Sequence, residues 1–146
     1  MEKVINLGIP HVSELVFESL KTQDLIKCLE VSQTWKELAE NVLIKRWKGK
    51  MFEACKTGET KIVQLLLECC TTEENGLNFK DTNGLTAFMW ACNKGHKYIV
   101  QLFLGHSDRI DLNARGIAGM TSFMTACSNG QKDVVKLLLD HLKELI

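Results

Sequence analysis

Six cysteines and four histidines are the side chains of this 146-residue chain that could bind a metal ion or carry out redox chemistry. Zinc sites need ligands paired at short spacings such as Cys-x-x-Cys, and the sequence contains no such pair. Cys69 and Cys70 are adjacent, but neither a second pair nor a histidine stands at ligand spacing from them. We therefore expect no metal ion, no cofactor and reduced thiols.

Motifs that activate a nucleophile or bind a phosphate are absent from the sequence. There is no Gly-x-Ser-x-Gly, no glycine-rich phosphate loop and no His-Glu-x-x-His, so we expect no catalytic residue and a protein that is not an enzyme. Lysine and arginine (18) balance aspartate and glutamate (18), which gives no electrostatic basis for binding nucleic acid or an anionic membrane. The N-terminus carries no apolar run typical of a signal peptide, and no segment is long enough to span a membrane. We expect a cytoplasmic and/or nuclear protein.

The elements that dominate the sequence are three copies of one pattern, Ala-Cys-x-x-Gly-x-x-x-(Ile/Val)-Val-x-Leu-x-Leu. The copies begin at Ala54, Ala91 and Ala126, at spacings of 37 and 35 residues. A period of this length indicates a solenoid of stacked helix pairs. Threonines ahead of the second and third copies, Thr86 and Thr121, are predicted to cap the helices that follow them.

Each copy predicts a short inner helix, a sharp turn and an outer helix. The Ala-Cys pair supplies small side chains where helices pack closely, which explains Cys55, Cys92 and Cys127 as buried packing residues. The glycines of the three copies are expected to end the inner helices in a left-handed conformation; they are Gly58, Gly95 and Gly130. The leucine-rich run forms the buried face of the outer helix.

On these residues the chain resembles the ankyrin repeats, most closely over residues 81–139. The resemblance implies repeats at about 51–80, 81–115 and 116–146. It also implies that a target protein binds the turn tips and the exposed side of the inner helices. The positions so implied are Lys80, Thr82, Asn83, Leu85, Trp90, Asn93, Lys94, Arg115, Ile117, Met120, Thr125, Ser128 and Asn129. Trp90 is either a binding anchor among them or a residue that packs over the neighbouring repeat.

The first fifty residues predict three short helices, from near Ser13 to Leu20, from Asp24 to about Glu30, and from a cap at Ser32 to about Trp47. They contain more large apolar side chains than so small a unit can bury alone. Residues 9–47 resemble an F-box. The leucine, the aspartate-leucine pair, the valine and the tryptophan of the F-box pattern correspond to Leu20, Asp24, Leu25, Val31 and Trp35. The resemblance implies a three-helix module that docks on an Skp-family adaptor through Ile9, Pro10, Leu15, Val16, Leu20, Leu25, Leu29, Val31 and Trp35.

The sequence therefore predicts an all-α chain with a three-helix F-box at residues 1–48 and a short ankyrin-repeat solenoid at residues 49–146. The function implied is substrate recognition in an SCF-type cullin-RING ubiquitin ligase, within the ubiquitin conjugation pathway. The partners implied are the Skp-family adaptor, through it the cullin-RING ligase, and an unidentified protein substrate. One alternative is a stand-alone ankyrin binding module or inhibitor, whose N-terminal helices cap the stack and whose apolar residues belong to its core. The other is an enzyme that depends on Cys69 or Cys70.

Overall fold

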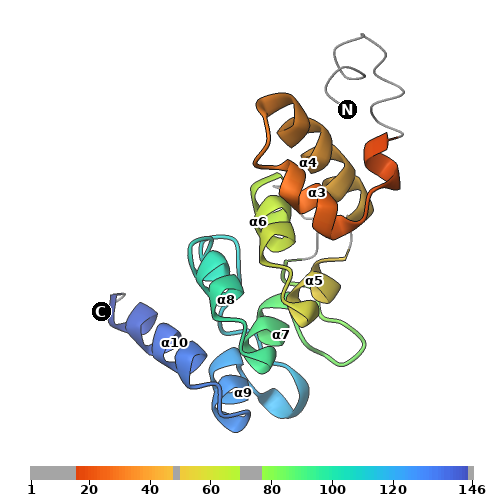
Figure 1. Cartoon of the computed structure of the whole chain (residues 1–146). Coiled ribbons are helices and arrows are strands. Elements are labelled where there is room, and N and C mark those ends of the chain that lie inside the picture. Colours follow the sequence, from red (N-terminus) through yellow and green to blue (C-terminus); the bar gives the residue numbers. More distant parts are fainter. Residues whose placement is uncertain (1–15, 48–49, 70–76, 145–146) are drawn as a thin grey trace. The chain divides into compact units, whose positions relative to one another are not determined.

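The computed structural model describes residues 16–47, 50–69 and 77–144, which form helices joined by turns, with no strand in these ranges. The chain separates into two compact units, Met1–Trp47 and Lys48–Ile146. Figure 1 shows the helices of both units. The architecture within the described ranges is thus all-α, with repeated helix pairs preceded by N-terminal helices.

The N-terminal unit contains a helical turn at residues 16–19, helix α3 (Thr22–Cys28) and helix α4 (Gln33–Trp47). Helix α3 begins and ends two residues earlier than the sequence predicts. Ser32 caps α4 as predicted, since its Oγ accepts a hydrogen bond from the Trp35 amide at 3.3 Å. Ser13, where the first helix was predicted to begin, lies outside the described residues.

The core of this unit is small and partly aromatic. Phe17, Leu25 and Ala39 are fully buried, and the rings of Phe17 and Trp35 meet edge to face with centroids 5.7 Å apart. Such a geometry is favourable because the positive edge of one ring faces the negative face of the other. Arg46 donates hydrogen bonds to the Leu20 carbonyl at 2.9 Å and to the Thr22 hydroxyl at 3.2 Å. These bonds fix the segment before α3 against the C-terminal end of α4.

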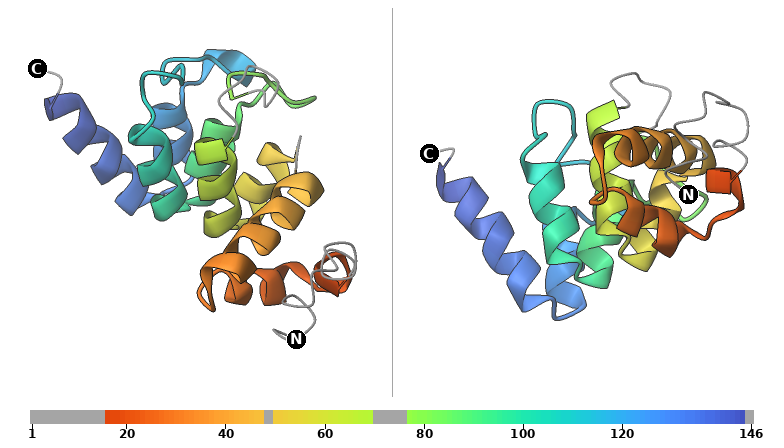
Figure 2. Two further views of the ribbon diagram at one scale, coloured as in Figure 1. Left: turned by 90° about the horizontal axis from the view of Figure 1, so that it is seen from above. Right: turned by 45° about the horizontal axis from the view of Figure 1, so that its top comes forward.

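The C-terminal unit consists of three helix pairs. The inner helices are α5 (Met51–Thr57), α7 (Ala87–Lys94) and α9 (Ser122–Ser128), and the outer helices are α6 (Thr60–Cys69), α8 (Lys97–Leu104) and α10 (Lys132–Glu144). Helix α7 packs between α5 and α9, and α8 packs between α6 and α10. Figures 1 and 2 show the two parallel rows that result. A short 3-10 turn, η2 (Ile117–Gly119), precedes α9.

The predicted helix boundaries of the repeats are confirmed. Thr86 accepts a hydrogen bond from the Met89 amide at 3.2 Å, and Thr121 accepts one from the Met124 amide at 3.3 Å. Each threonine oxygen thereby satisfies an amide that the first turn of a helix leaves unpaired. The three glycines predicted to be left-handed have φ values of 80°, 76° and 67°; they are Gly58, Gly95 and Gly130.

Close packing of the inner helices explains the repeated Ala-Cys pair, with one difference from the prediction. Cys55 and Cys92 are completely buried where the next inner helix covers them, whereas Cys127 is exposed. Cys127 lies on α9, and no described helix of this chain packs on the far side of α9. Burial of this position therefore depends on the following repeat and not on the residue type.

A side chain from each following repeat also bonds to the end of the preceding inner helix. A ring nitrogen of His96 lies 3.2 Å from the Lys56 carbonyl oxygen, and the Gln131 amide donates to the Asn93 carbonyl at 2.9 Å. The two contacts occupy equivalent positions in successive repeats. They satisfy carbonyls that a helix C-terminus leaves without an intrahelical partner.

We predict that Gly95→Ala destabilises the chain more than Gly130→Ala does. Both glycines have positive φ, so alanine at either position adds about 1–2 kcal/mol of backbone strain. At Gly95 the added Cβ would also overlap the Gln131 carboxamide, whereas at Gly130 it meets no atom within 4 Å. Displacing Gln131 removes its hydrogen bond to Asn93, which adds about 1 kcal/mol.

Urea unfolding followed by circular dichroism measures this difference. Gly130→Ala serves as the matched control, because it carries the strain without the overlap. Equal losses of unfolding free energy in the two variants would contradict the described contact between repeats.

Candidate protein-binding surface

The residues predicted to bind a target differ in the solvent exposure of their side chains. Thr125 is buried, and its hydroxyl donates to the Thr121 carbonyl at 2.9 Å, so its side chain does not face a partner. Four of the residues are half-buried: Leu85, Trp90, Asn93 and Met120. The other eight are exposed: Lys80, Thr82, Asn83, Lys94, Arg115, Ile117, Ser128 and Asn129.

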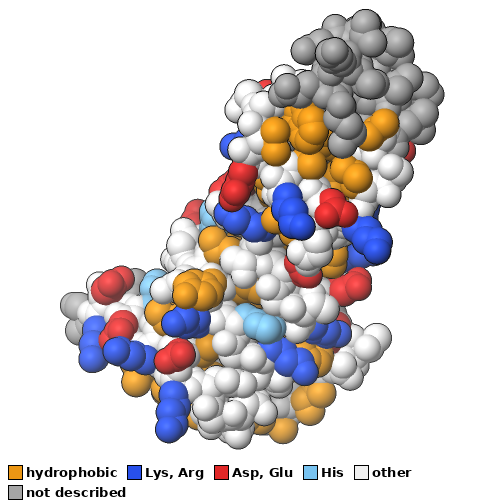
Figure 3. Space-filling model, viewed as in Figure 1, with side chains coloured by type: hydrophobic (Ala, Val, Ile, Leu, Met, Phe, Trp, Pro, Cys, Tyr) orange, Lys and Arg blue, Asp and Glu red, His pale blue; other side chains and the backbone are white. Residues whose placement is uncertain are grey.

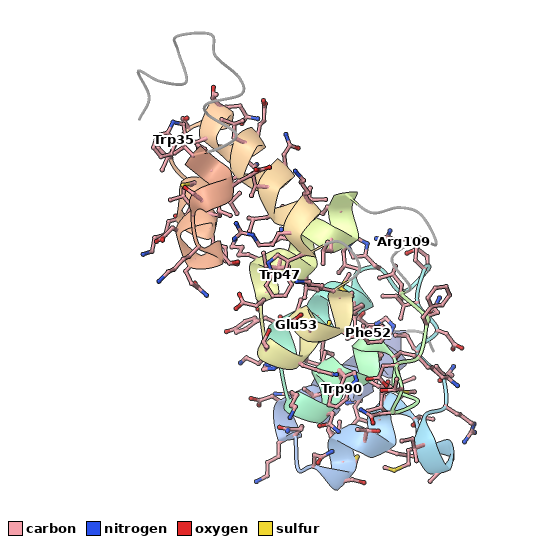
Figure 4. All side chains as sticks on the ribbon, turned by 90° about the vertical axis from the view of Figure 1, so that its right-hand side faces the viewer. Trp35, Trp47, Phe52, Glu53, Trp90 and Arg109 are labelled. Atoms are coloured by element: carbon pink, nitrogen blue, oxygen red, sulfur yellow. The ribbon has the colours of Figure 1, made fainter. Side chains whose placement is uncertain are left out.

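Trp90 is held in place by its own chain. Its indole Nε1 donates to Asp81 Oδ2 at 2.6 Å, and the Lys56 ammonium lies 4.3 Å from the centroid of a Trp90 ring. Lys56 is also 3.6 Å from Asp81 Oδ2, so the three side chains form one cluster that joins the first two repeats. Figure 4 shows Trp90 on α7, among the sticks of the C-terminal unit. The structure therefore favours the interpretation that Trp90 packs over the neighbouring repeat.

Asp81 organises the turn that leads into α7. Its Oδ1 accepts hydrogen bonds from the amides of Asn83 at 2.9 Å and Leu85 at 3.1 Å. Burial raises the pKa of this carboxyl, but the hydrogen bonds from Leu85, Trp90 and Asn83 and the positive charge of Lys56 outweigh burial. The net effect is a pKa below the usual value for aspartate.

Two successive inter-repeat turns are bonded to each other. The Asn78 side chain donates to the Arg109 carbonyl at 3.1 Å and accepts a hydrogen bond from the Asp111 amide at 2.7 Å. Arg109 in turn donates to the Leu67 carbonyl of α6 at 2.7 Å. These bonds fix the turns in the free chain, which lowers the entropy that binding a partner would cost.

Large apolar side chains project from these fixed turns. Phe79 is 63% exposed and Ile117 is 60% exposed. Phe79 is absent from the sequence-based candidates. The signal that identifies it is an aromatic residue in the otherwise polar turn from Asn78 to Gly84. We call the exposed turn residues Phe79, Lys80, Thr82, Asn83, Arg115 and Ile117 the tip surface.

The residues predicted to bind an adaptor divide into several groups. Ile9, Pro10 and Leu15 lie outside the described residues. Leu25 is fully buried and belongs to the core, whereas Val31 is 55% exposed. The remaining four, Val16, Leu20, Leu29 and Trp35, are half-buried. The sequence left this division between core and surface open.

Cys55 and Cys92 have the properties of packing residues. Burial raises the pKa of Cys92 to about 12, against the opposing effect of a hydrogen bond with Ser122, and burial also raises the pKa of Cys55. Both thiols therefore stay protonated at neutral pH and are poor nucleophiles and ligands. The described ranges contain no group of three or more His, Cys, Asp or Glu side chains placed to hold a metal ion. Cys70 and the side chain of Cys69 lie outside what the structure describes.

Within the described ranges, no helix is both long enough and apolar enough to cross a membrane.

We predict that Asp81→Asn lowers the unfolding free energy at pH 7 by about 1–2 kcal/mol, because the charged acceptor is lost and the new amide faces the Trp90 indole N–H. The folded-state pKa of Asp81 is lowered, so its stabilisation is present above the unfolded pKa of about 3.9 and is lost as pH falls through the folded value. The difference between wild type and variant should be constant from pH 7 to pH 5 and should narrow below about pH 4.

Urea titrations at each pH test this, with Asp111→Asn as the control. Asp111 is exposed, and among the described contacts its side chain accepts only the Asn113 amide, a bond that asparagine keeps. A wild-type-to-variant difference that stays unchanged down to pH 3 would contradict the Asp81 cluster.

Comparison with known proteins identifies the repeats. Residues 51–145 match the family of ankyrin repeats in three copies. A chain from the complex of the Bd0816 predatory endopeptidase of Bdellovibrio bacteriovorus with immunity protein Bd3460 is 27% identical, with a TM-score of 0.54 over 62% of this chain and 45% of that chain. The human ASB11 ankyrin repeat domain, 22% identical with a TM-score of 0.52 over 62% of this chain and 38% of that chain, supports the fold alone.

This chain spans less than half the length of either matched chain. A search of curated proteins gives no match. The family match begins at residue 51, so the F-box resemblance of the N-terminal residues stays a prediction. The repeat pattern, the stacked helix pairs and the family match agree, and the chain belongs to the ankyrin-repeat family of protein-binding modules.

Proposed function

We propose that this chain binds one target protein through the tip surface and acts by occupying the part of the target that it covers. The observation that carries the proposal is the exposure of Phe79 and Ile117 on turns fixed by hydrogen bonds. Asn78, next to Phe79, bonds to the following turn, and the Gly116 amide, next to Ile117, donates to the Met120 carbonyl at 2.8 Å. Large exposed apolar side chains on a rigid support are typical of interface anchors. The chain contributes no bond-making step in this function.

The charges around the anchors indicate what the target presents. Lys80 and Arg115 are exposed within the tip surface and Lys94 is exposed on α7, while the carboxylate of Asp81 is engaged by Trp90 and Lys56. The two charged residues of the tip surface, Lys80 and Arg115, are therefore both cations. We expect a target segment that places apolar side chains against Phe79 and Ile117 and carboxylates beside the cations.

An inhibitory mode of action is supported by the similarity to a chain in an endopeptidase–immunity protein complex. An inhibitor needs only to cover a functional surface of its target, and a rigid apolar tip surface is suited to that. This is the stand-alone binding module that the sequence analysis gave as an alternative.

We predict that Phe79→Glu/Ile117→Glu weakens target binding by about 30-fold or more, the effect of losing an anchor worth roughly 2 kcal/mol. The measurement is affinity capture with the full chain from extracts of its native cells, quantified by mass spectrometry for wild type and variant. Tyr98→Glu is the matched control, because Tyr98 is 62% exposed on the outer helix α8, away from the turns.

A target retained by wild type and Tyr98→Glu but lost by the double variant supports the tip surface, and purified target then gives the affinities. Circular dichroism checks that the variants remain folded. If every captured protein binds wild type and the double variant equally, the tip surface is not the binding site.

Substrate recognition in a ubiquitin ligase is the second candidate function, and a feature of the N-terminal unit favours it. Val31 is 55% exposed, and Trp35 carries a buried indole Nε1 that finds no hydrogen-bond partner among the described residues. Both occupy positions of the F-box resemblance, on either side of the capping residue Ser32 at the start of α4. An adaptor that covered Val31 would bury apolar surface that this small unit cannot bury by itself. Such a complex would act in the cytoplasm and/or nucleus.

We predict that Val31→Asp abolishes a one-to-one complex with a co-expressed Skp-family adaptor while the chain stays folded. Val31 is the informative position because it is exposed, whereas an aspartate at the fully buried Leu25 would unfold the unit and give an ambiguous loss. Asn41→Asp, on an exposed position of α4, adds the same charge as a control.

Size-exclusion chromatography with light scattering measures the complex. Loss for Val31→Asp and retention for Asn41→Asp supports adaptor docking. A wild-type chain that elutes as a folded monomer apart from the adaptor rules this candidate function out and leaves the stand-alone module.

A further inference from the structure

The turn before α7 contains an asparagine-glycine pair, Asn83-Gly84, whose asparagine belongs to the tip surface. Asparagine followed by glycine is chemically labile, because no side chain hinders the approach of the glycine nitrogen to the asparagine carboxamide. The same pair occurs at Asn129-Gly130, in the turn after α9. Hydroxyl residues, Thr82 and Ser128, precede the two pairs, so their local sequences are closely matched. The chain therefore presents one dipeptide in two structural settings.

The two asparagine side chains differ in their hydrogen bonds. The Asn129 carboxamide donates to the Thr125 carbonyl at 2.9 Å. The carboxamide of Asn83 is exposed and makes no hydrogen bond within the described part of the chain. The backbone amides of both following glycines donate to carbonyls, at 2.9 Å for Gly84 and 3.1 Å for Gly130, so this factor is shared. Asn83 is thus the one of the two that can turn toward its glycine without first breaking a described side-chain bond.

The fold requires the glycine of this pair but not the asparagine. Gly84 has a φ of 73°, and a Cβ built on it would lie 3.2 Å from Ile117 Cγ1. Any larger residue at position 84 would therefore be both strained and crowded. The equivalent of Asn83 in the next repeat is Ala118, so the corresponding turn forms there without a carboxamide.

We propose that Asn83 deamidates spontaneously and that the product lowers the affinity of the tip surface for its target. The Gly84 nitrogen attacks Cγ of Asn83, and the new C–N bond closes a succinimide ring. The Cγ–Nδ2 bond breaks, and the side-chain nitrogen leaves as ammonia with the proton of the Gly84 amide. Water then opens the ring at either carbonyl, which gives aspartate or isoaspartate. Water is the only co-reactant, and no electron is transferred.

Either product changes the tip surface. A carboxylate at position 83 offsets one of the positive charges of Lys80 and Arg115. Basic and acidic side chains are interspersed on the face seen in Figure 3, and salt screens exposed charges over about 10 Å, so the change is local. Isoaspartate also adds one carbon to the backbone of the turn in which Asp81 accepts the amides of residues 83 and 85. The effect on a target rests on the proposed function, whereas the deamidation itself does not.

Incubation of the purified full chain at mildly alkaline pH, followed by tryptic peptide mass spectrometry, tests the reaction. Asn83 should deamidate about fivefold faster than Asn129, the difference expected when one hydrogen bond must break before the attack. In urea, which unfolds both turns, the two rates should converge. Cleavage at Lys80 separates Asn83 from Asn75-Gly76, a further pair that lies outside the described residues.

Variants at position 83 test the effect on the target. In the capture experiment described for the tip surface, Asn83→Asp, which imitates one product, should weaken target binding about threefold, the effect of an exposed charge. Asn83→Ala removes the reacting group, so it should keep its binding through the alkaline incubation while wild type loses affinity. Asn41→Asp adds the same charge on an exposed position of α4 and should leave binding unchanged.

The outcomes separate the deamidation from its effect. Equal rates at Asn83 and Asn129 in the folded chain, or a rate difference that persists in urea, would overturn the assignment of Asn83. Binding by Asn83→Asp that equals wild type would overturn the effect on the tip surface. A chain that captures no target contradicts the proposed function, and the mass-spectrometric comparison still decides whether Asn83 is the modified residue.

Discussion

The close approach of successive inner helices is the constraint on which the C-terminal unit depends. Helices α5, α7 and α9 can pack directly on one another because the buried residues at the two contacts are small, namely the Ala-Cys pairs of α5 and α7 and Ala126 of α9. The left-handed glycine that ends each inner helix lets the chain turn back at once, so that the outer helix covers the same repeat. His96 and Gln131 then bond across to the preceding repeat and fix the spacing. A larger residue or a missing glycine would separate the layers.

The tip surface follows from this stacking. Because the helices hold the turns at a fixed separation, Asn78 can bond to the backbone of the next turn, and Asp81 can reach both Trp90 of its own repeat and Lys56 of the preceding one. The polar side chains of Asn78 and Asp81 thus form hydrogen bonds within the repeat stack, whereas Phe79 and Ile117 are exposed to solvent. The turns combine internal hydrogen bonding with an external apolar surface, which is the combination that preorganised binding requires.

The same stacking leaves an apolar surface at the last repeat. Cys55 and Cys92 are buried by the inner helix of the repeat that follows each of them. Cys127 is the equivalent residue of the third repeat and is exposed, because no described helix packs over it. The N-terminal unit has a related property on a smaller scale. Its few core residues, Phe17 and Leu25 among them, are fully buried, yet Val31 is left exposed. Each unit therefore carries exposed apolar side chains among its described residues.

The sequence by itself determined the features that depend on neighbouring residues along the chain: the helix pairs, the threonine caps, the left-handed glycines and the family. These follow from local backbone conformation and from a period that repeats three times. Only the tertiary structure decided which side chains face outward. Trp90 is fixed by Asp81 and Lys56, Thr125 is buried, and Phe79 is exposed. The exposure of a side chain depends on residues distant in sequence that pack against it, and a local pattern carries no record of those contacts.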